Sequence, residues 1–205
     1  MSTRLLLVLA LLPLACNAKI KKDMADVKHA SDEYGDAKAE MNAYNAESQA
    51  KADAGWEQGM AVYDAYMADP PPPAPTELDA AIAWMTTRLD KVTEADSHFA
   101  DVQFAAQSKR GYYTHLRLGE MQERLVNEAF GFSESLSAED YKEFHGLGYI
   151  LTAIDDAERH FNAWEGAYAD SGDDIKDELA DDIAKAEAKR DEMRARREES
   201  LKISE

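Results

Sequence analysis

Cysteine is almost absent from this chain of 205 residues, in which Cys16 is the only one. A lone thiol cannot form a disulfide within the chain, and no other residue supports thiol catalysis or a cysteine-rich metal site. Basic residues are scarce as well: 23 Lys and Arg stand against 41 Asp and Glu, so the net charge is −18. Nucleic acid and anionic membrane surfaces bind clustered positive charge, so we expect neither as a partner of the folded body.

Strand signals are also missing. Glycine is sparse, with 10 residues, and no stretch alternates apolar and polar residues as a half-buried strand does. The periodic segments repeat instead at about 3.6 residues, the period of an α-helix. We therefore predict an all-α fold of helical hairpins, stacked as a degenerate repeat or bundle, with long amphipathic flanking helices.

The motifs of common active sites are not found. The chain has no glycine-rich phosphate loop and no Gly-x-Ser-x-Gly turn for a nucleophile. The stretch after residue 170 resembles a calcium loop, but Ile175 and Asp181 stand where an EF-hand needs Gly and Glu. His98 and His160 each lie one helical turn after an acidic residue, a coincidence to be expected in so acidic a chain. We predict no enzymatic activity, no cofactor and no metal site.

The first eighteen residues have the pattern of a secretory signal peptide: one positive charge, an apolar run too short to span a bilayer, and then small residues. Residues 13–16 resemble the lipobox of bacterial lipoproteins, in which the cysteine is acylated. That resemblance implies a lipid on Cys16, and the following Asn17 favours the outer membrane, with the protein facing the periplasm. The alternative is cleavage after Ala18, which would give a soluble periplasmic or secreted protein.

Two segments precede the expected core. Residues 19–69 carry one thin apolar stripe, typical of a coiled-coil-like helical arm. Gly35, Gly55 and Gly59 each weaken a helix by about 1 kcal/mol relative to Ala, so we expect the arm to be interrupted. Residues 70–75 are five prolines and one alanine, which favour polyproline II and a stiff spacer between arm and core.

Residues 76–170 are expected to form the helical core. Its first apolar seam meets a charge at Asp96, so we expect a break there and a next helix that ends at 109–111, where basic residues precede a glycine. A further helix is expected over 112–130, and another begins with a cap at Ser137. The most regular stripe consists of Ile150, Ile154, Ala157, Phe161, Trp164 and Tyr168. Residues 171–205 have the pattern of a charged C-terminal helix. We expect both this helix and the arm to be less stable than the core.

Aromatic residues at helical spacings are the remaining signal. Most aromatic side chains of this kind pack between helices. Some could line a groove for a partner helix or peptide, because Tyr and Trp are enriched at interface anchors. The candidate interface residues are Trp56, Tyr63, Tyr66, Tyr112, Tyr113 and Trp164.

Residues 113–120, with the pair Leu118 and Gly119, resemble the first helix of a tetratricopeptide repeat. Ala157 and Phe161 resemble the Ala and Phe of its second helix. The long separation of the two halves implies an insertion that carries residues 136–141. The pattern is similar to degenerate repeats in exported lipoproteins of gliding and predatory bacteria. This resemblance implies a protein-binding scaffold at the cell envelope, for example in an outer-membrane or motility complex.

Together these observations predict a non-enzymatic, membrane-anchored periplasmic scaffold. Its partners would be other envelope proteins, and it would touch the membrane only through its lipid. Two other functions stay open: a structural coiled-coil spacer lipoprotein, and a helical bundle that binds a small ligand or a metal. A concave, aromatic-lined groove would favour the scaffold, a straight rod or trimer the spacer, and a buried cluster of His and Glu the ligand binder.

Overall fold

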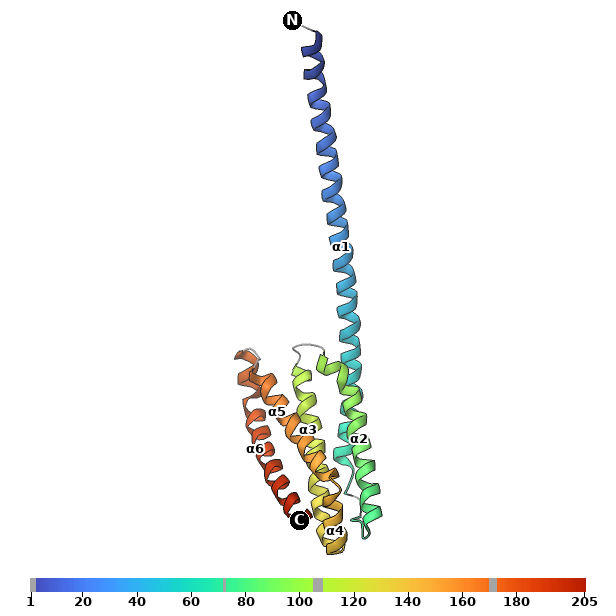
Figure 1. Cartoon of the computed structure of the whole chain (residues 1–205), viewed down its shortest axis with the longest axis vertical. Helices are drawn as coiled ribbons and strands as arrows, with labels where there is room; N and C mark the ends of the chain where they lie inside the picture. Colours follow the sequence, from blue (N-terminus) through green and yellow to red (C-terminus); the bar gives the residue numbers. More distant parts are fainter. Residues whose placement is uncertain (1–2, 72, 105–108, 170–172) are drawn as a thin grey trace. The chain divides into compact units, whose positions relative to one another are not determined.

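The computed structural model describes residues 3–71, 73–104, 109–169 and 173–205. Within these residues it contains helices but no strand, which confirms the predicted all-α fold. In chain order the elements are α1 Thr3–Ala68, α2 Leu78–Phe104, α3 Lys109–Phe130, the short 3₁₀-helix η1 Gly131–Glu134, α4 Ala138–Gly146, α5 Tyr149–Ala169 and α6 Asp173–Ser204 (Figure 1). The chain divides into two units, residues 1–47 and 48–205, and α1 contributes to both.

Helix α1 is unbroken, so the interruption expected at its glycines is wrong. Two of these glycines are needed where α1 approaches α2. A Cβ atom added to Gly55 would overlap the carbonyl oxygen of His98, and one added to Gly59 would overlap the ring of Phe99. The close packing that glycine permits here offsets its low helix propensity.

The end of α1 shares a small core with α2 and α3. Its buried members are Tyr66, Val92, Ala95, Phe99, Val102, Leu118 and Met121, with Trp56, Met60, Val62 and Tyr63 packed against them. Each large apolar side chain that is buried in this way stabilises the folded state by about 1.5–3 kcal/mol. Residues 48–68 therefore belong to the unit formed by residues 48–205. The sequence analysis had placed them in a separate arm that ended at residue 69.

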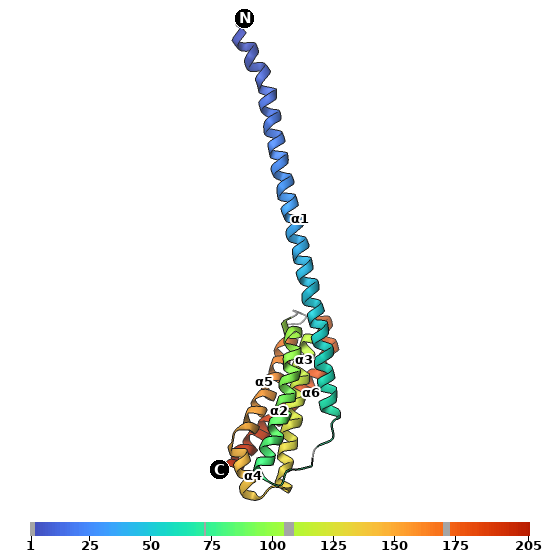
Figure 2. The ribbon, with the colours of Figure 1, turned by 90° about the vertical axis from the view of Figure 1, so that its right-hand side faces the viewer.

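A larger core joins α2 and α3 to η1, α4, α5 and α6. Five residues of the predicted stripe on α5 are buried in it, namely Ile150, Ile154, Ala157, Phe161 and Trp164, whereas Tyr168 lies outside the described side chains. Helix α5 packs closely on α3, where a Cβ atom on Gly119 would lie only 2.7 Å from the ring of Phe161. Figures 1 and 2 both place α4 and the C-terminus at the same end of this bundle, and Lys142 donates to the carbonyl oxygen of Glu205 there.

Two boundaries predicted within the core are wrong. Helix α2 continues past Asp96, because the residue that faces the core is its neighbour Ala95, while Asp96 itself is exposed. The basic residues Lys109 and Arg110 begin α3 instead of ending the preceding helix. By contrast, the cap at Ser137 is confirmed, since its hydroxyl accepts a hydrogen bond from the amide of Asp140 at 3.1 Å.

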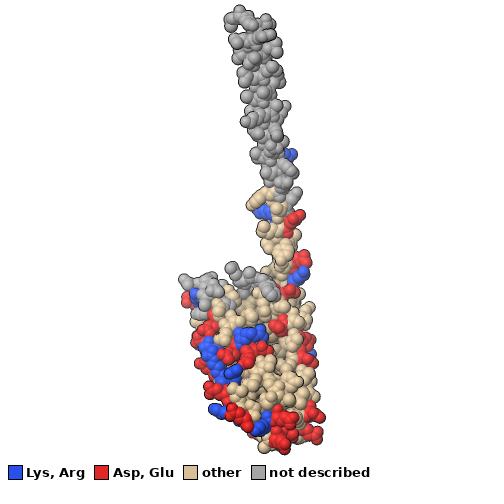
Figure 3. All heavy atoms as spheres, in the orientation of Figure 1, with Lys and Arg blue, Asp and Glu red and all other residues tan. Residues whose placement is uncertain are grey.

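Helix α6 is part of the compact unit and packs along α5 and α4. Leu179, Ile183, Ala186 and Met193 are buried on one face. Arginines of α6 pair with acids of α5: Arg190 with Glu165, Arg194 with Glu158 and Arg197 with Asp155. Charges of both signs intermingle over these helices, and acidic side chains gather at the end of the unit where α4 lies (Figure 3). The charged helix is thus held by its buried face and by these ion pairs. The sequence analysis had instead placed α6 outside the core.

Candidate functional site

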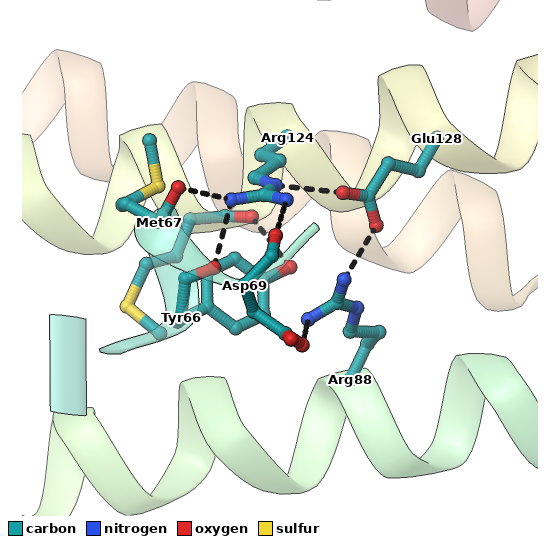
Figure 4. Close-up of polar contacts among 7 residues, drawn as sticks. Tyr66, Met67, Asp69, Arg88, Arg124 and Glu128 are labelled. Carbon is teal, nitrogen blue, oxygen red and sulfur yellow. Dashed lines mark hydrogen bonds and ion pairs between the residues drawn. The ribbon is translucent and has the colours of Figure 1, made fainter. Parts of the chain in front are cut away.

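An arginine clamp holds the end of α1 against α3. The last carbonyl groups of a helix have no partner within it. Arg124 of α3 supplies one, because its guanidinium donates to the carbonyl oxygens of Tyr66 (2.7 Å), Met67 (2.6 Å) and Asp69 (Figure 4). Its Nε donates at the same time to the Glu128 carboxylate at 2.6 Å, which fixes the guanidinium plane.

A second arginine completes the clamp from α2. Arg88 is only 5% exposed. Its guanidinium donates to the Asp69 carboxylate at 2.9 Å and pairs with Glu128 at 3.3 Å. It also lies 4.9 Å from the centre of the Tyr66 ring, as expected for a cation–π contact. Two arginines and two carboxylates therefore tie α1, α2 and α3 together at one point (Figure 4).

Beside this clamp lies an open groove of about 640 Å³. Its apolar walls come from Met67, Pro71, Ala74, Trp84 and Phe132. Trp84 and Phe132 meet edge to face, with ring centres 4.7 Å apart, a favourable arrangement for two aromatic rings. The proline segment forms one side of the groove and is anchored where it ends, since the Ser135 hydroxyl donates to the carbonyl oxygen of Pro75 at 2.7 Å.

Three carboxylates line the same groove, and each already has a cationic partner. Glu120 accepts from Arg117 at 2.8 Å, Glu123 pairs with Lys189, and Glu128 is held by the clamp. Tyr63 also donates to Glu120 at 2.7 Å. Burial, together with this hydrogen bond, raises the pKa of Tyr63 to about 12. A partner that covered the groove would therefore not bury an unpaired charge, which is the costly event in desolvating a polar surface.

The six aromatic residues predicted as an interface serve mainly as packing residues. Trp164 and Tyr66 are buried, and Tyr66 donates to the carbonyl oxygen of Met121 at 3.2 Å. Tyr112 and Tyr113 contact the Trp164 ring, with centres 6.5 and 5.0 Å away. Tyr113 also donates to the Asp182 carboxylate of α6 at 2.9 Å.

The remaining two of the six lie on α1 and are half-buried. The Trp56 ring lies 5.9 Å from that of Phe99, and Tyr63 makes the hydrogen bond to Glu120 given above. The structure therefore brings Tyr112, Tyr113 and Trp164 into one cluster and spreads the others along α1. None of the six lines the groove.

His145 and His160 are buried, and His115 is half-buried. His115 and His160 face each other with their Nδ1 atoms 3.3 Å apart, so one nitrogen donates and the other accepts. Burial lowers the pKa of His160 to about 3, and the nearby Arg159 and His115 act in the same direction. His145 contacts the Ser200 hydroxyl at 2.8 Å, and burial lowers the pKa of His145 to about 4.

Acidic residues do not join these histidines in a metal site. Across the part of the chain that the structure describes, no three His, Cys, Asp or Glu side chains come together as metal ligands would. The acids one turn before His98 and His160 pair elsewhere: Glu94 with Lys91 and Asp156 with Arg159.

Besides Tyr168, two features singled out in the sequence lie outside the described residues or side chains. They are the side chain of Cys16, with its expected lipid, and the loop at 170–172. Among the described helices, none combines the length and apolar character needed to cross a bilayer.

Sequence reasoning missed the groove residues. Trp84 is the neighbour of Met85, a buried residue of the apolar stripe of α2, and so widens that stripe; this was a usable signal. Arg124 and Glu128 stand four residues apart, as ion pairs on a helix do. Such a pair is common on exposed helices, so it could not have indicated that Arg124 caps another helix.

Comparison with known proteins returns no relative. The chain matches no protein-family model, no curated protein and no solved structure.

Proposed function

We propose that this protein is a non-enzymatic, lipid-anchored scaffold of the bacterial cell envelope that binds a segment of another envelope protein in the groove beside the arginine clamp. The observation that carries the proposal is the groove itself, with its apolar walls and its internally paired charges. Binding sites for peptides and small molecules are typically concave and mostly apolar, with a few placed polar groups. The groove fits that description, and its rim offers the exposed amide of Asn127 for a hydrogen bond.

The partner segment expected here is amphipathic and presents apolar side chains. Trp84 and Phe132 would take its anchor residues, because aromatic side chains in a pocket contribute most to interface affinity. A strongly acidic segment is disfavoured by the net charge of −18. Basic residues at the edge of the segment would be attracted by that charge and would speed association.

The resemblance to a tetratricopeptide repeat adds support. The two residues that carry it from opposite halves, Gly119 and Phe161, are in close contact between α3 and α5. The chain between them forms η1 and α4, in keeping with an insertion between the two helices of a repeat. Repeats of this type are scaffolds whose stacked helices form extended binding surfaces.

Site-specific photo-crosslinking in envelopes would test the groove. A photoreactive residue at Asn127, on the groove, should give a discrete crosslinked product, whereas one at Glu187, exposed on α6, should not. Trp84→Ala should remove the product at position 127 without unfolding the bundle, and Trp84→Phe should restore most of it. The proposal fails if both positions give the same products or if Trp84→Ala leaves the product unchanged.

The anchor is tested separately. Cys16→Ser should move the protein from the detergent phase to the aqueous phase and abolish incorporation of labelled fatty acid. Equal partitioning of both forms would contradict the lipid anchor but would leave the groove hypothesis standing.

A further inference from the structure

Two histidine side chains meet end to end between α3 and α5. His115 of α3 and His160 of α5 lie with their Nδ1 atoms 3.3 Å apart and their ring centres 5.6 Å apart. The second distance is about the largest that two imidazole rings can reach at that separation of their nitrogens, so the rings lie in line, nitrogen toward nitrogen. The lone-pair axes of the two Nδ1 atoms therefore point at each other.

The packing of α3 on α5 holds this arrangement. A Cβ atom on Gly119, one turn after His115, would lie 2.7 Å from the ring of Phe161, the residue that follows His160. Helices that approach so closely at this point keep the two histidine rings opposite each other. His160 is only 6% exposed and His115 is half-buried, so an ion would reach the pair from the side of His115.

We propose that His115 and His160 form a two-coordinate site for Cu(I), which binds between the two Nδ1 atoms. This inference goes beyond the proposed function and does not depend on the groove. Spacings within one helix could not reveal such a site, because the pair joins two helices and its members stand 45 residues apart. Imidazole is a common copper ligand, and Cu(I), with its filled d shell, accepts two nitrogen ligands in line.

The distance between the nitrogens is close to what the ion needs. Bonds of about 2 Å to imidazole nitrogen require the two Nδ1 atoms to move apart by roughly 0.7 Å. A small rotation of the half-buried His115 ring supplies this movement, because the last side-chain torsion of histidine has a broad energy minimum.

Both rings are already in the form that a metal binds. Burial lowers the pKa of each histidine, so both are uncharged at neutral pH. In the metal-free pair one Nδ1 carries a proton and donates it to the other. When the ion binds, that proton moves to Nε2 of the same ring, and both Nδ1 lone pairs become ligands while the rings stay neutral.

The number of ligands and the local charges favour a monovalent ion. Zn²⁺ takes four ligands, and among the residues that the structure describes no third His, Cys, Asp or Glu side chain joins this pair. A single positive charge also costs less than a double one in a buried position. Asp96 of α2 favours positive charge at His115, and Arg159, which opposes it, is paired with Asp156 at 2.9 Å.

Competition with a coloured Cu(I) chelator, under anaerobic and reducing conditions, tests the site. The full chain carries Cys16→Ser, because a thiolate is a softer ligand that would compete for Cu(I). The parent chain should take up one Cu(I), and His115→Asn and His160→Asn should each weaken binding at least tenfold. His98→Asn and His145→Asn, which change histidines outside the pair, are the matched controls and should bind Cu(I) as the parent does.

Thermal unfolding gives a second readout on the same proteins. Cu(I) should raise the Tm of the parent and of both controls, since an ion that binds only the folded state stabilises it. It should leave the Tm of His115→Asn and His160→Asn unchanged. Because His115 is half-buried, its variant tests the site even where His160→Asn weakens the fold.

X-ray absorption at the copper edge identifies the ligands directly. Two nitrogen ligands and no sulfur are expected, whereas the 8 methionines of the chain would give sulfur ligands. The proposal is overturned if the parent takes up no Cu(I), if sulfur binds the ion, or if uptake survives both His115→Asn and His160→Asn.

Discussion

The buried histidines make the stability of the 48–205 unit depend on pH in a calculable way. The pKa of a histidine in an unfolded chain is about 6.5. Burial lowers that of His160 to about 3 and that of His145 to about 4. The unfolded chain therefore takes up protons first as the pH falls below 6.5, and the free energy of unfolding must fall with it.

The magnitude follows from the same values. At pH 5 each of these histidines is almost fully charged in the unfolded chain and almost fully neutral in the fold. The free energy of unfolding therefore falls by about 2 kcal/mol per histidine between pH 7 and pH 5. Two histidines together remove about 4 kcal/mol, a large share of the 5–15 kcal/mol (roughly) that stabilises a typical domain. His115, whose pKa burial also lowers, adds to the loss in the same direction.

Other charges also shift the pKa values of these histidines. The test therefore compares variants with the parent chain and does not rely on the pH dependence of one protein alone. Asp96 favours the charged form of His115, Arg159 opposes it, and Glu199 favours the charged form of His145. Partial neutralisation of a chain with a net charge of −18 also relieves repulsion at low pH. Within a matched pair of variants the repulsion largely cancels.

The assay is urea unfolding at pH 7 and pH 5. His160→Asn and His145→Asn place an amide near the position of Nδ1, where it can still hydrogen-bond but cannot titrate. Each should reduce the loss of unfolding free energy between the two pH values by about 2 kcal/mol, whatever its effect at pH 7. His98→Asn, on the partly exposed face of α2, controls for the substitution. Variants that lose as much stability as the parent chain would refute the reasoning.

Three further outcomes are expected. Gly59→Ala should destabilise the fold by about 1–3 kcal/mol through overpacking. Gly166→Ala has open space at its Cβ position and should be neutral or stabilising by up to about 1 kcal/mol. Thermal unfolding compares the two variants, and equal effects would contradict the close approach of α1 and α2. Phe161→Ala should cost about 3–5 kcal/mol, and a neutral result in the same assay would mean that the α5 stripe is not buried. Arg124→Gln should cost about 1–3 kcal/mol and speed amide hydrogen exchange at the end of α1; unchanged exchange there would show that the clamp does not hold that helix end.

The features that the sequence predicted well are those that a short segment determines. The stripe from Ile150 to Trp164 keeps its side chains on one helix face whatever surrounds it, so its burial was predictable. The cap at Ser137 depends on an amide only three residues away. The all-α class follows from the period of the apolar residues in the same local way.

The features that were mispredicted depend on a distant partner. Gly55 and Gly59 look like weak points when α1 is considered alone, and they become contact points only when α2 lies beside them. Asp96 looks like a break when the seam is read in strict heptads, but a shift of one residue brings Ala95 to the core. Helix α6 looks like an exposed arm when it is considered alone, because the acids that pair with its arginines lie on α5. A pattern within one segment cannot show which neighbour satisfies it.

The groove shows the same principle at a functional surface. Its walls come from the end of α1, the proline segment, α2, α3 and η1, so no single segment carries its signature. The clamp holds Asp69, the residue just before the proline segment. Ser135 holds the last residue of the segment, Pro75. Because proline has no amide hydrogen, this wall presents fewer backbone donors than an ordinary loop. A partner that covers it leaves few donors without a hydrogen bond, and the cost of binding that usually arises from buried, unpaired backbone groups is correspondingly small.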